Sequence, residues 1–310
     1  QPPQLLESAE AWLWLQQPHP AAEFIWLHVN LSQANSLIWL QQRLDLPEEF
    51  YETLHEQATS TRIERVDETL LAIINDVLFD FNFEDSDIAT LWLAARPQLL
   101  ITARLRPLRS VDRLRMAVKE GELFESPLAL LVHLFQDQAD VLTQIVRQMA
   151  SRCDDIEDRL LANRGTPPRA ALGTMRRLLV RLQRLLAPEP SALFRLLNRP
   201  PHWVQEHDRQ ELRQSTEEFA SVIQDMHSLQ ERIKLLQEEI AAQVNEQNNR
   251  SLFVLTTVSV LALPINIIAG LLGMNVGGIP LADNSHGFWL IVLLVASFTA
   301  IAVYWIFGRS

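Results

Sequence analysis

The chain has 310 residues, enough for two ordinary domains, and its formal net charge of -11 argues against nucleic acid as a partner of the whole molecule. Cys153 is the single cysteine, so the chain can form neither an intrachain disulfide nor a cysteine-type zinc site. The sequence has no phosphate-binding loop and no nucleophilic triad, so we expect neither an enzyme nor a bound cofactor. The first ten residues lack the basic and apolar segments of a secretory signal peptide.

Residues 1–125 are expected to form an α/β domain in the cytoplasm. Clusters of β-branched and aromatic residues predict four strands. These are residues 23–29, 69–81, 88–95 and 98–105. The second segment is long enough that a helix stays open there. Two further segments are expected to be helical, residues 32–44 and 47–57.

Residues 126–250 have a helical pattern. Helices are predicted at residues 128–161, 169–186 and 191–197. From Phe219 onward, apolar residues alternate three and four positions apart, as in the seam of a helix that packs against other helices. This seam consists of Phe219, Val222, Met226, Leu229, Ile233, Leu236 and Ile240. It could pack against the two preceding helices of the same chain or against another subunit, and both interpretations stay open.

One long helix is expected to link the cytoplasmic region to the C-terminal end. No proline or glycine lies between Val204 and Leu263, so a helix of about 60 residues and roughly 90 Å is possible. Its stalk part is expected at about residues 204–250. Pro264 should loosen the helix one turn before it. The remaining residues, 251–310, are predicted to form a transmembrane hairpin.

The hairpin prediction rests on two uncharged segments. Residues 252–272 and 288–307 contain no charged residue, and each stretch of about 20 residues can cross a hydrocarbon core of about 30 Å. A pair of buried core helices is the alternative. Arg250 precedes the first span and Arg309 follows the second, whereas the linking segment 273–287 has no lysine or arginine. The positive-inside rule then places both termini in the cytoplasm and the loop outside.

Small and polar residues of the first span share one helical face. Ser259, Asn266 and Gly270 are separated by seven and then four positions. Three leucines complete the stripe: Leu252, Leu255 and Leu263. An asparagine in a bilayer is costly unless its amide is hydrogen-bonded, so Asn266 should face either water or another helix. Because two spans cannot enclose a passage, a transport protein of this kind has to assemble from several copies.

The segment Gly273-Met274-Asn275 ends the first span, above a long helix and before a second terminal span. In this position it resembles the CorA superfamily of divalent metal transporters, and residues 263–272 are also similar to that family's first span. The resemblance implies a homopentamer in the bacterial inner membrane, with a funnel-shaped cytoplasmic domain and a central pore lined by the first span. The expected fold class is α+β, with the stalk helix continuous with the first transmembrane helix.

The residues after this motif look like the zinc-transporting ZntB branch of the superfamily, in which Gly-Gly-Ile-Pro follows, here Gly277, Gly278, Ile279 and Pro280. The magnesium branch usually has an aromatic and an acidic residue where this chain has Val276 and Gly277. The resemblance therefore implies Zn2+ as the transported ion, with uptake coupled to protons. A channel for Mg2+, Co2+ or Ni2+ is the runner-up, and a membrane-anchored coiled-coil adaptor or sensor is a further alternative.

The resemblance also assigns roles to individual residues. It places Asn275 at the outer pore mouth, where amide oxygens would accept hydrogen bonds from the water shell of a dication. Gly273 would permit a sharp turn, and Met274 would point away from the axis. Neither span contains Asp, Glu, His or Cys, so we identify no direct metal ligand set and expect a largely hydrated ion. Asp283 and His286 could attract ions to the loop, although ordinary solvated loop residues are the simpler interpretation.

Two other polar segments invite comparison with metal sites. Residues 202–207, HWVQEH, are one residue too long for the H-x-x-E-H zinc pattern. Residues 153–158, CDDIED, are acidic and could bind a cation, but the solvated face of a helix is the favoured interpretation.

Overall fold

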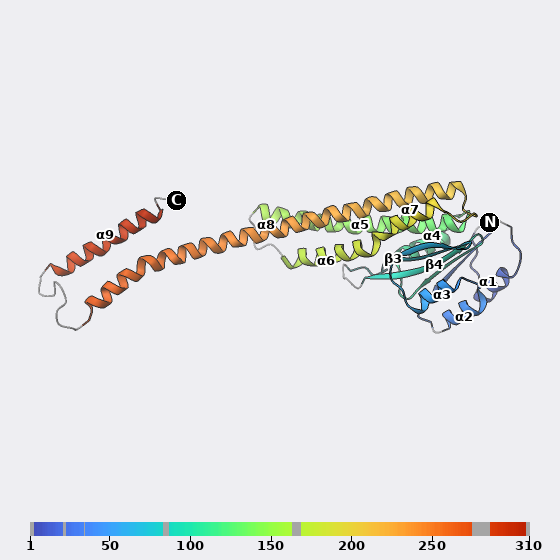
Figure 1. Ribbon diagram of the computed structural model, residues 1–310, viewed down its shortest axis with the longest axis horizontal. Helices are drawn as coiled ribbons and strands as arrows, with labels where there is room; N and C mark the ends of the chain where they lie inside the picture. Colours follow the sequence, from blue (N-terminus) through green and yellow to red (C-terminus); the bar gives the residue numbers. More distant parts are fainter. Residues whose placement is uncertain are drawn as a thin grey trace. The chain divides into compact units, whose positions relative to one another are not determined.

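The computed structural model describes residues 3–20, 23–33, 35–82, 87–162, 169–274 and 286–307. Contacts between residues divide the chain into two units, Gln1–Gln237 and Glu238–Ser310. The first unit contains the sheet and most of the helices, and the second contains the apolar C-terminal helices (Figure 1).

A five-stranded sheet forms the centre of the first unit, in the order β1-β5-β4-β3-β2. The strands are β1 (Ile25–Asn30), β2 (Arg62–Val66), β3 (Thr69–Val77), β4 (Ile88–Arg96) and β5 (Leu99–Arg104). β1 pairs with β5 in parallel, and the other neighbours are antiparallel. All nine residues of β3 are buried, which explains why its sequence is apolar without alternation. The strand interpretation of this segment is therefore confirmed.

Helices cover both faces of the sheet, because successive strand residues point to opposite sides. On one face, Leu71, Ile73 and Trp92 pack with α1, α2 and α3. On the other, Leu70 and Leu93 pack with α4, α5 and α7. The bounds of these helices are α1 (Ser8–Leu15), α2 (Ser36–Arg43), α3 (Glu48–His55), α4 (Arg109–Glu120), α5 (Pro127–Leu161) and α7 (Pro188–Asn198).

Several short elements differ from the prediction. α2 begins at Ser36 rather than at residue 32, and α7 begins at Pro188 rather than at residue 191. The elements α1, β2 and α4 were not predicted. β2 is an edge strand with the sequence RIERV, and charged side chains on edge strands hide the alternation that would reveal them.

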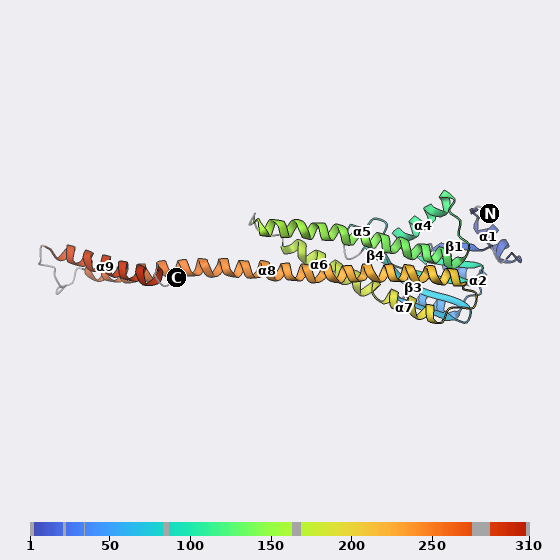
Figure 2. The ribbon, with the colours of Figure 1, turned by 90° about the horizontal axis from the view of Figure 1, so that it is seen from above.

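α5, α6 (Arg169–Leu186) and the first part of α8 (Glu206–Leu272) lie side by side in both views (Figures 1 and 2). The seam of α8 is buried within the single chain: Phe219, Met226 and Ile233 are 0% exposed. Arg232 of α8 also forms ion pairs with Asp154 and Glu157 of α5. Packing within the chain is therefore the correct interpretation of this part of the seam, and any association between copies has to use other faces.

The second unit contains the rest of α8 and α9 (Gly287–Phe307). α8 continues through Pro264 without interruption, so the predicted continuity of the stalk helix with the first apolar span is confirmed. Both helices are long and apolar enough to cross a membrane. Almost none of their apolar length is buried inside the chain, which does not fit the alternative of two core helices.

Candidate ion pathway

The predicted stripe lies on the exposed surface of α8 in the second unit. Its leucines, Leu252, Leu255 and Leu263, have 59%, 63% and 61% of their surface exposed. Its small and polar members are also exposed: Ser259, Asn266 and Gly270. At 3.6 residues per turn, these six positions fall within an arc of about 80°. We call them the polar stripe.

The opposite side of this helix is the one that is partly covered within the chain. Thr257 is buried, and Leu261, Ile265 and Ile268 are half-buried. By helical geometry, their common direction lies about 170° from the polar stripe. α9 runs back beside this part of α8 in Figures 1 and 2. The half-buried residues of α9 also share one face: Ile291, Val295, Thr299 and Ala302. The polar stripe therefore faces away from α9.

The polar stripe presents neutral oxygen acceptors between apolar side chains. The hydroxyl of Ser259 donates a hydrogen bond to the carbonyl oxygen of Leu255 at 2.9 Å, so its oxygen can still accept one. The side-chain amide of Asn266 makes no hydrogen bond with any residue that the structure describes. A Cβ atom at Gly270 would meet nothing within 4 Å, so the helix surface is open there.

The end of α8 explains the glycine at position 273. The backbone N–H of Gly273 donates to the carbonyl oxygen of Ala269 at 2.9 Å. A Cβ atom at Gly273 would lie 3.0 Å from that same oxygen, so a larger residue would force the last turn to shift. Gly273 has no left-handed backbone angle, so close approach, rather than the expected sharp turn, is the reason for glycine.

The remaining predicted loop residues are only partly described. Met274 follows the helix and is 48% exposed. Asn275 and Asp283 lie outside the described residues, as does the segment 276–280. His286 is exposed, and its carbonyl oxygen accepts a hydrogen bond from Leu290 at the start of α9.

The seven-residue spacing of Leu252, Ser259 and Asn266 also extends toward the start of the second unit. Asn245 and Glu238 occupy the two preceding positions of the same series, and both are exposed. One edge of α8 therefore changes from carboxylate through amide to leucine, and then to hydroxyl and amide again. The uncharged span alone does not reveal this continuity, because Glu238 and Asn245 lie before it in the charged part of the helix.

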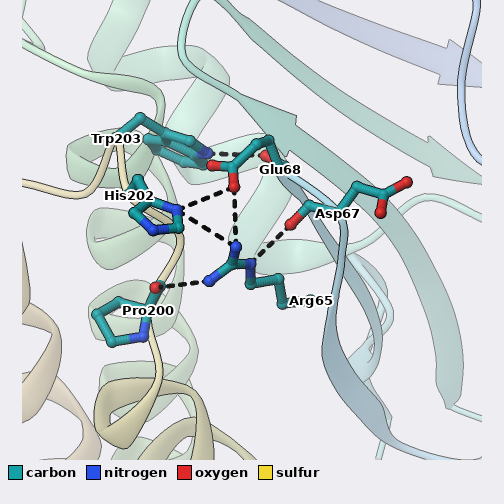
Figure 3. A network of polar contacts seen from close by, with 6 residues as sticks. All are labelled: Arg65, Asp67, Glu68, Pro200, His202 and Trp203. Carbon is teal, nitrogen blue, oxygen red and sulfur yellow. Dashed lines mark hydrogen bonds and ion pairs between the residues drawn. The ribbon is translucent and has the colours of Figure 1, made fainter.

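The histidine-rich segment at residues 202–207 anchors the start of α8 (Figure 3). His202 Nδ1 lies 3.0 Å from Glu68 Oε1, and this contact lowers the pKa of Glu68. Trp203 Nε1 donates to the carbonyl oxygen of Glu68 at 2.8 Å. Arg65 donates to the Glu68 carboxylate at 2.8 Å and to the Pro200 carbonyl oxygen at 3.3 Å. The segment thus ties the turn between β2 and β3 to the connection between α7 and α8.

The described residues contain no group of three or more His, Cys, Asp or Glu side chains arranged to hold a metal ion. In the acidic segment at residues 153–158, Asp154 and Glu157 pair with Arg232, and Cys153 is buried. Both polar segments therefore have structural partners.

A buried polar cluster in the first unit was not predicted. Glu189 accepts hydrogen bonds from the backbone N–H of Asn75 at 2.9 Å and from Gln138 Nε2 at 3.1 Å. Gln138 Nε2 also donates to the Asn75 carbonyl oxygen at 2.7 Å. Ile73 is the last β3 residue paired with β2, so these side chains satisfy β3 where its neighbour ends. Burial raises the pKa of Glu189 well above its usual value, and raises that of Asp76 to about 6.

Comparisons with known proteins agree with this architecture. A family model described as "CorA-like Mg2+ transporter protein" matches residues 21–309. The divalent cation transporter CmaX of Pseudomonas aeruginosa is 30% identical over 289 residues, which cover 93% of this chain and 87% of that protein. The zinc transport protein ZntB of Pectobacterium atrosepticum is 24% identical over 281 residues, which cover 91% of this chain and 86% of that protein.

Solved structures support the same fold. The structure of the full-length CmaX protein matches with a TM-score of 0.78 and 29% identity, covering 92% of this chain and 88% of that one. The structure of the CorA magnesium transporter from Methanocaldococcus jannaschii also matches with a TM-score of 0.78, at 22% identity, covering 95% of this chain and 93% of that one. At this identity the match shows a shared fold alone. With a family model that matches nearly its whole length and a 30% identical relative, the chain belongs to the CorA-like family of divalent cation transporters.

Proposed function

We propose that this chain carries Zn2+ across the bacterial inner membrane, as a homopentamer whose central pore is lined by the polar stripe of α8. The observation that carries this proposal is the direction of the stripe. Its oxygen-bearing side chains point away from α9, so α9 can lie on the lipid side while the stripe faces an axis shared by several copies. Lipid contact would leave the Asn266 amide without hydrogen bonds, which is costly in hydrocarbon.

Assembly follows from the same geometry. Two helices per chain cannot enclose an aqueous passage, whereas several copies of α8 around an axis can. The number five comes from the family resemblance. Both termini would lie in the cytoplasm, because Arg250 and Arg309 flank the hairpin on that side.

The ion would pass largely hydrated. The stripe offers amide and hydroxyl oxygens, which can bind the water shell of a dication without replacing it. Leu252, Leu255 and Leu263 would form the apolar narrow section, where loss of water could close the pore. Asn275 would form the outer ring and Glu238 would lie toward the cytoplasmic side. An inside-negative potential favours inward movement of a dication by about 4.6 kcal/mol per 100 mV, which is twice the value for one charge.

Zinc as the transported ion is supported by Gly277-Gly278-Ile279-Pro280 and by the ZntB relatives. A magnesium channel is the second candidate, because the matching family model carries that description. Coupling to protons rests on the resemblance. The described spans contain no titratable carboxyl or imidazole, so any proton carrier there would have to belong to the external loop, where Asp283 and His286 lie.

The test is flux through the full-length protein in proteoliposomes with an inside-negative potential, measured side by side for Zn2+ and Mg2+. We expect Zn2+ flux that Asn275→Ala strongly reduces. Asn249→Ala, the same change at an exposed position off the stripe, is the matched control. Equal flux for Asn275→Ala and the parent would contradict the pore assignment. Mg2+ flux without Zn2+ flux would favour the magnesium channel. Absence of flux for both ions would favour the membrane-anchored adaptor or sensor. A Zn2+ flux indifferent to a pH gradient would remove the coupling.

A further inference from the structure

Helix α6 carries an unbalanced positive charge. It has five arginines and no acidic residue within a chain whose net charge is -11. These are Arg169, Arg176, Arg177, Arg181 and Arg184. Leu172 and Leu182 are among the apolar residues that the helix buries on one face. Arg177 and Arg184 are exposed on the opposite face and Arg176 is exposed at its edge, and we call these three residues the cationic ridge.

The cationic ridge is not neutralised within the part of the chain that the structure describes. Arg176 donates to the side-chain oxygen of Gln237 at 3.3 Å, and Arg177 donates to the hydroxyl of Thr174 at 3.1 Å. Neither acceptor is charged, and no ridge residue forms an ion pair with a described residue. Beside the ridge, Arg181 has a buried Nε atom without a hydrogen-bond partner among the described residues.

A complementary surface lies on the stalk part of α8. Glu218 and Asp225 are exposed and sit beside the buried seam rather than in it, and we call them the acidic flank. Glu218 accepts a hydrogen bond from neutral Gln214, and Asp225 forms no ion pair with a described residue. Glu218 and Asp225 are seven positions apart, and so are Arg177 and Arg184. Within each pair, the two residues are therefore about 10 Å from each other along their helix.

We propose that the cationic ridge of α6 docks on the acidic flank of α8 in a second copy of this chain, an inference that rests on the oligomer of the proposed function. The seam of α8 is already occupied by α5 and α6 of its own chain, so a neighbour can reach only the remaining faces. Positions that flank a buried seam are where adjacent helices exchange ion pairs. Equal spacing and opposite charge select the acidic flank as the partner.

An anionic lipid surface is the other conceivable partner of a basic helix. Helices that lie on membranes insert an apolar face into the interface beside their basic residues. In α6 that apolar face is already buried in the first unit, with Leu172, Leu179 and Leu182 each 0% exposed. On its outer face the helix presents the arginines and one large exposed apolar side chain, Val180, which is too little to insert into a membrane interface. This face therefore fits a charged protein surface better.

The experiment exchanges the charges in the full-length protein and measures its oligomeric state by native mass spectrometry. The variants are Arg177→Glu/Arg184→Glu, Glu218→Arg/Asp225→Arg, and all four changes together. Each double variant replaces attraction by repulsion, so we expect about a tenfold increase in the protein concentration needed for half-assembly. The fourfold variant should restore assembly. Arg195→Glu, a charge reversal at an exposed position of α7, should have no effect.

Each result bears on the proposal. Loss of assembly in both double variants, with recovery in the fourfold variant, supports the proposal. Weaker assembly of the parent in 1 M NaCl also supports it, and this measurement tests the charge contacts even if a variant misfolds. A ridge variant that assembles normally overturns the proposal. A ridge defect that the fourfold variant does not correct also overturns it. If that defect occurs only in nanodiscs that contain phosphatidylglycerol, the partner of the ridge is an anionic lipid surface. If the parent assembles and carries Zn2+ while the ridge variants assemble and transport as well as the parent, the docking fails while the proposed pore stands.

Discussion

Replacing Gln138 by leucine should destabilise the first unit by removing donors from the buried polar cluster. Gln138 is 1% exposed, and its Nε2 atom donates both to the Asn75 carbonyl oxygen at 2.7 Å and to Glu189 at 3.1 Å. Each buried acceptor left without a donor costs about 1–3 kcal/mol. Part of this free-energy cost is offset. Gln138 Oε1 is buried without a hydrogen-bond partner among the described residues, and leucine removes this unpaired oxygen. We expect a net loss of about 3 kcal/mol.

The loss should grow with pH. Because burial raises the folded-state pKa of Glu189 above its unfolded value, the stability linked to its proton is fully present below pH 4.5 and declines as the pH rises toward the folded pKa. Without the donor from Gln138, the ionised carboxylate is less stabilised and the folded pKa rises further. The difference in unfolding free energy between parent and variant should therefore be larger at pH 8 than at pH 5.

The assay is thermal unfolding of the full-length protein in detergent, followed by tryptophan fluorescence at both pH values. For a unit of this size, about 3 kcal/mol corresponds to a lower Tm by about 6–12 °C. Gln148→Leu, at an exposed position of the same helix, is the matched control and should shift Tm little. If Gln138→Leu behaves like this control, or if its effect is the same at both pH values, the cluster does not stabilise the unit as argued.

Three further outcomes are expected. Asn266→Leu removes five amide oxygens from the proposed pore at about 1 kcal/mol each, so ion flux in proteoliposomes should fall by about a thousandfold or more. Burial and the Arg104 guanidinium lower the pKa of His28 to about 4. Between about pH 6.5 and pH 4, only the unfolded chain gains the proton, so the free energy of unfolding should fall as the pH is lowered through this range. Unfolding measured at several pH values checks this. Gly273→Ala should weaken the end of α8, since a carbonyl oxygen lies 3.0 Å from the Cβ position, whereas Gly270→Ala should leave the fold intact in circular dichroism.

Long elements with strong burial patterns could be predicted from the sequence. The seam beginning at Phe219 and the uncharged span that follows reveal α8 because their periodicity continues over many turns. β3 could be identified for a related reason, since a strand buried on both faces is apolar throughout. Short elements at the margin of the sheet could not, because β2 owes its place to pairing with β3 rather than to its own residues.

The buried cluster was beyond sequence inspection for a different reason. Asn75 and Glu189 are 114 positions apart, and Gln138 lies between them in the sequence on a third element. Only the fold brings such residues together. The polar stripe is an intermediate case, since helical spacing groups Ser259 with Asn266 but cannot say which way they point. That direction depends on which side of α8 faces α9.

The burial of the seam also bears on how copies of this chain would associate. Phe219, Met226 and Ile233 are fully buried in one chain, so folding of the first unit does not need a neighbour. Apart from Leu235, the surface of the stalk that remains for a neighbour is mostly polar, and it carries Glu218 and Asp225. Association through such a surface depends on charge rather than on apolar area, and charge pairs in water are weakened by salt. Folding of the first unit should therefore resist high ionic strength, whereas assembly of the copies should not. Such a difference in salt dependence would indicate that folding uses the buried seam of α8 and assembly uses its charged flank.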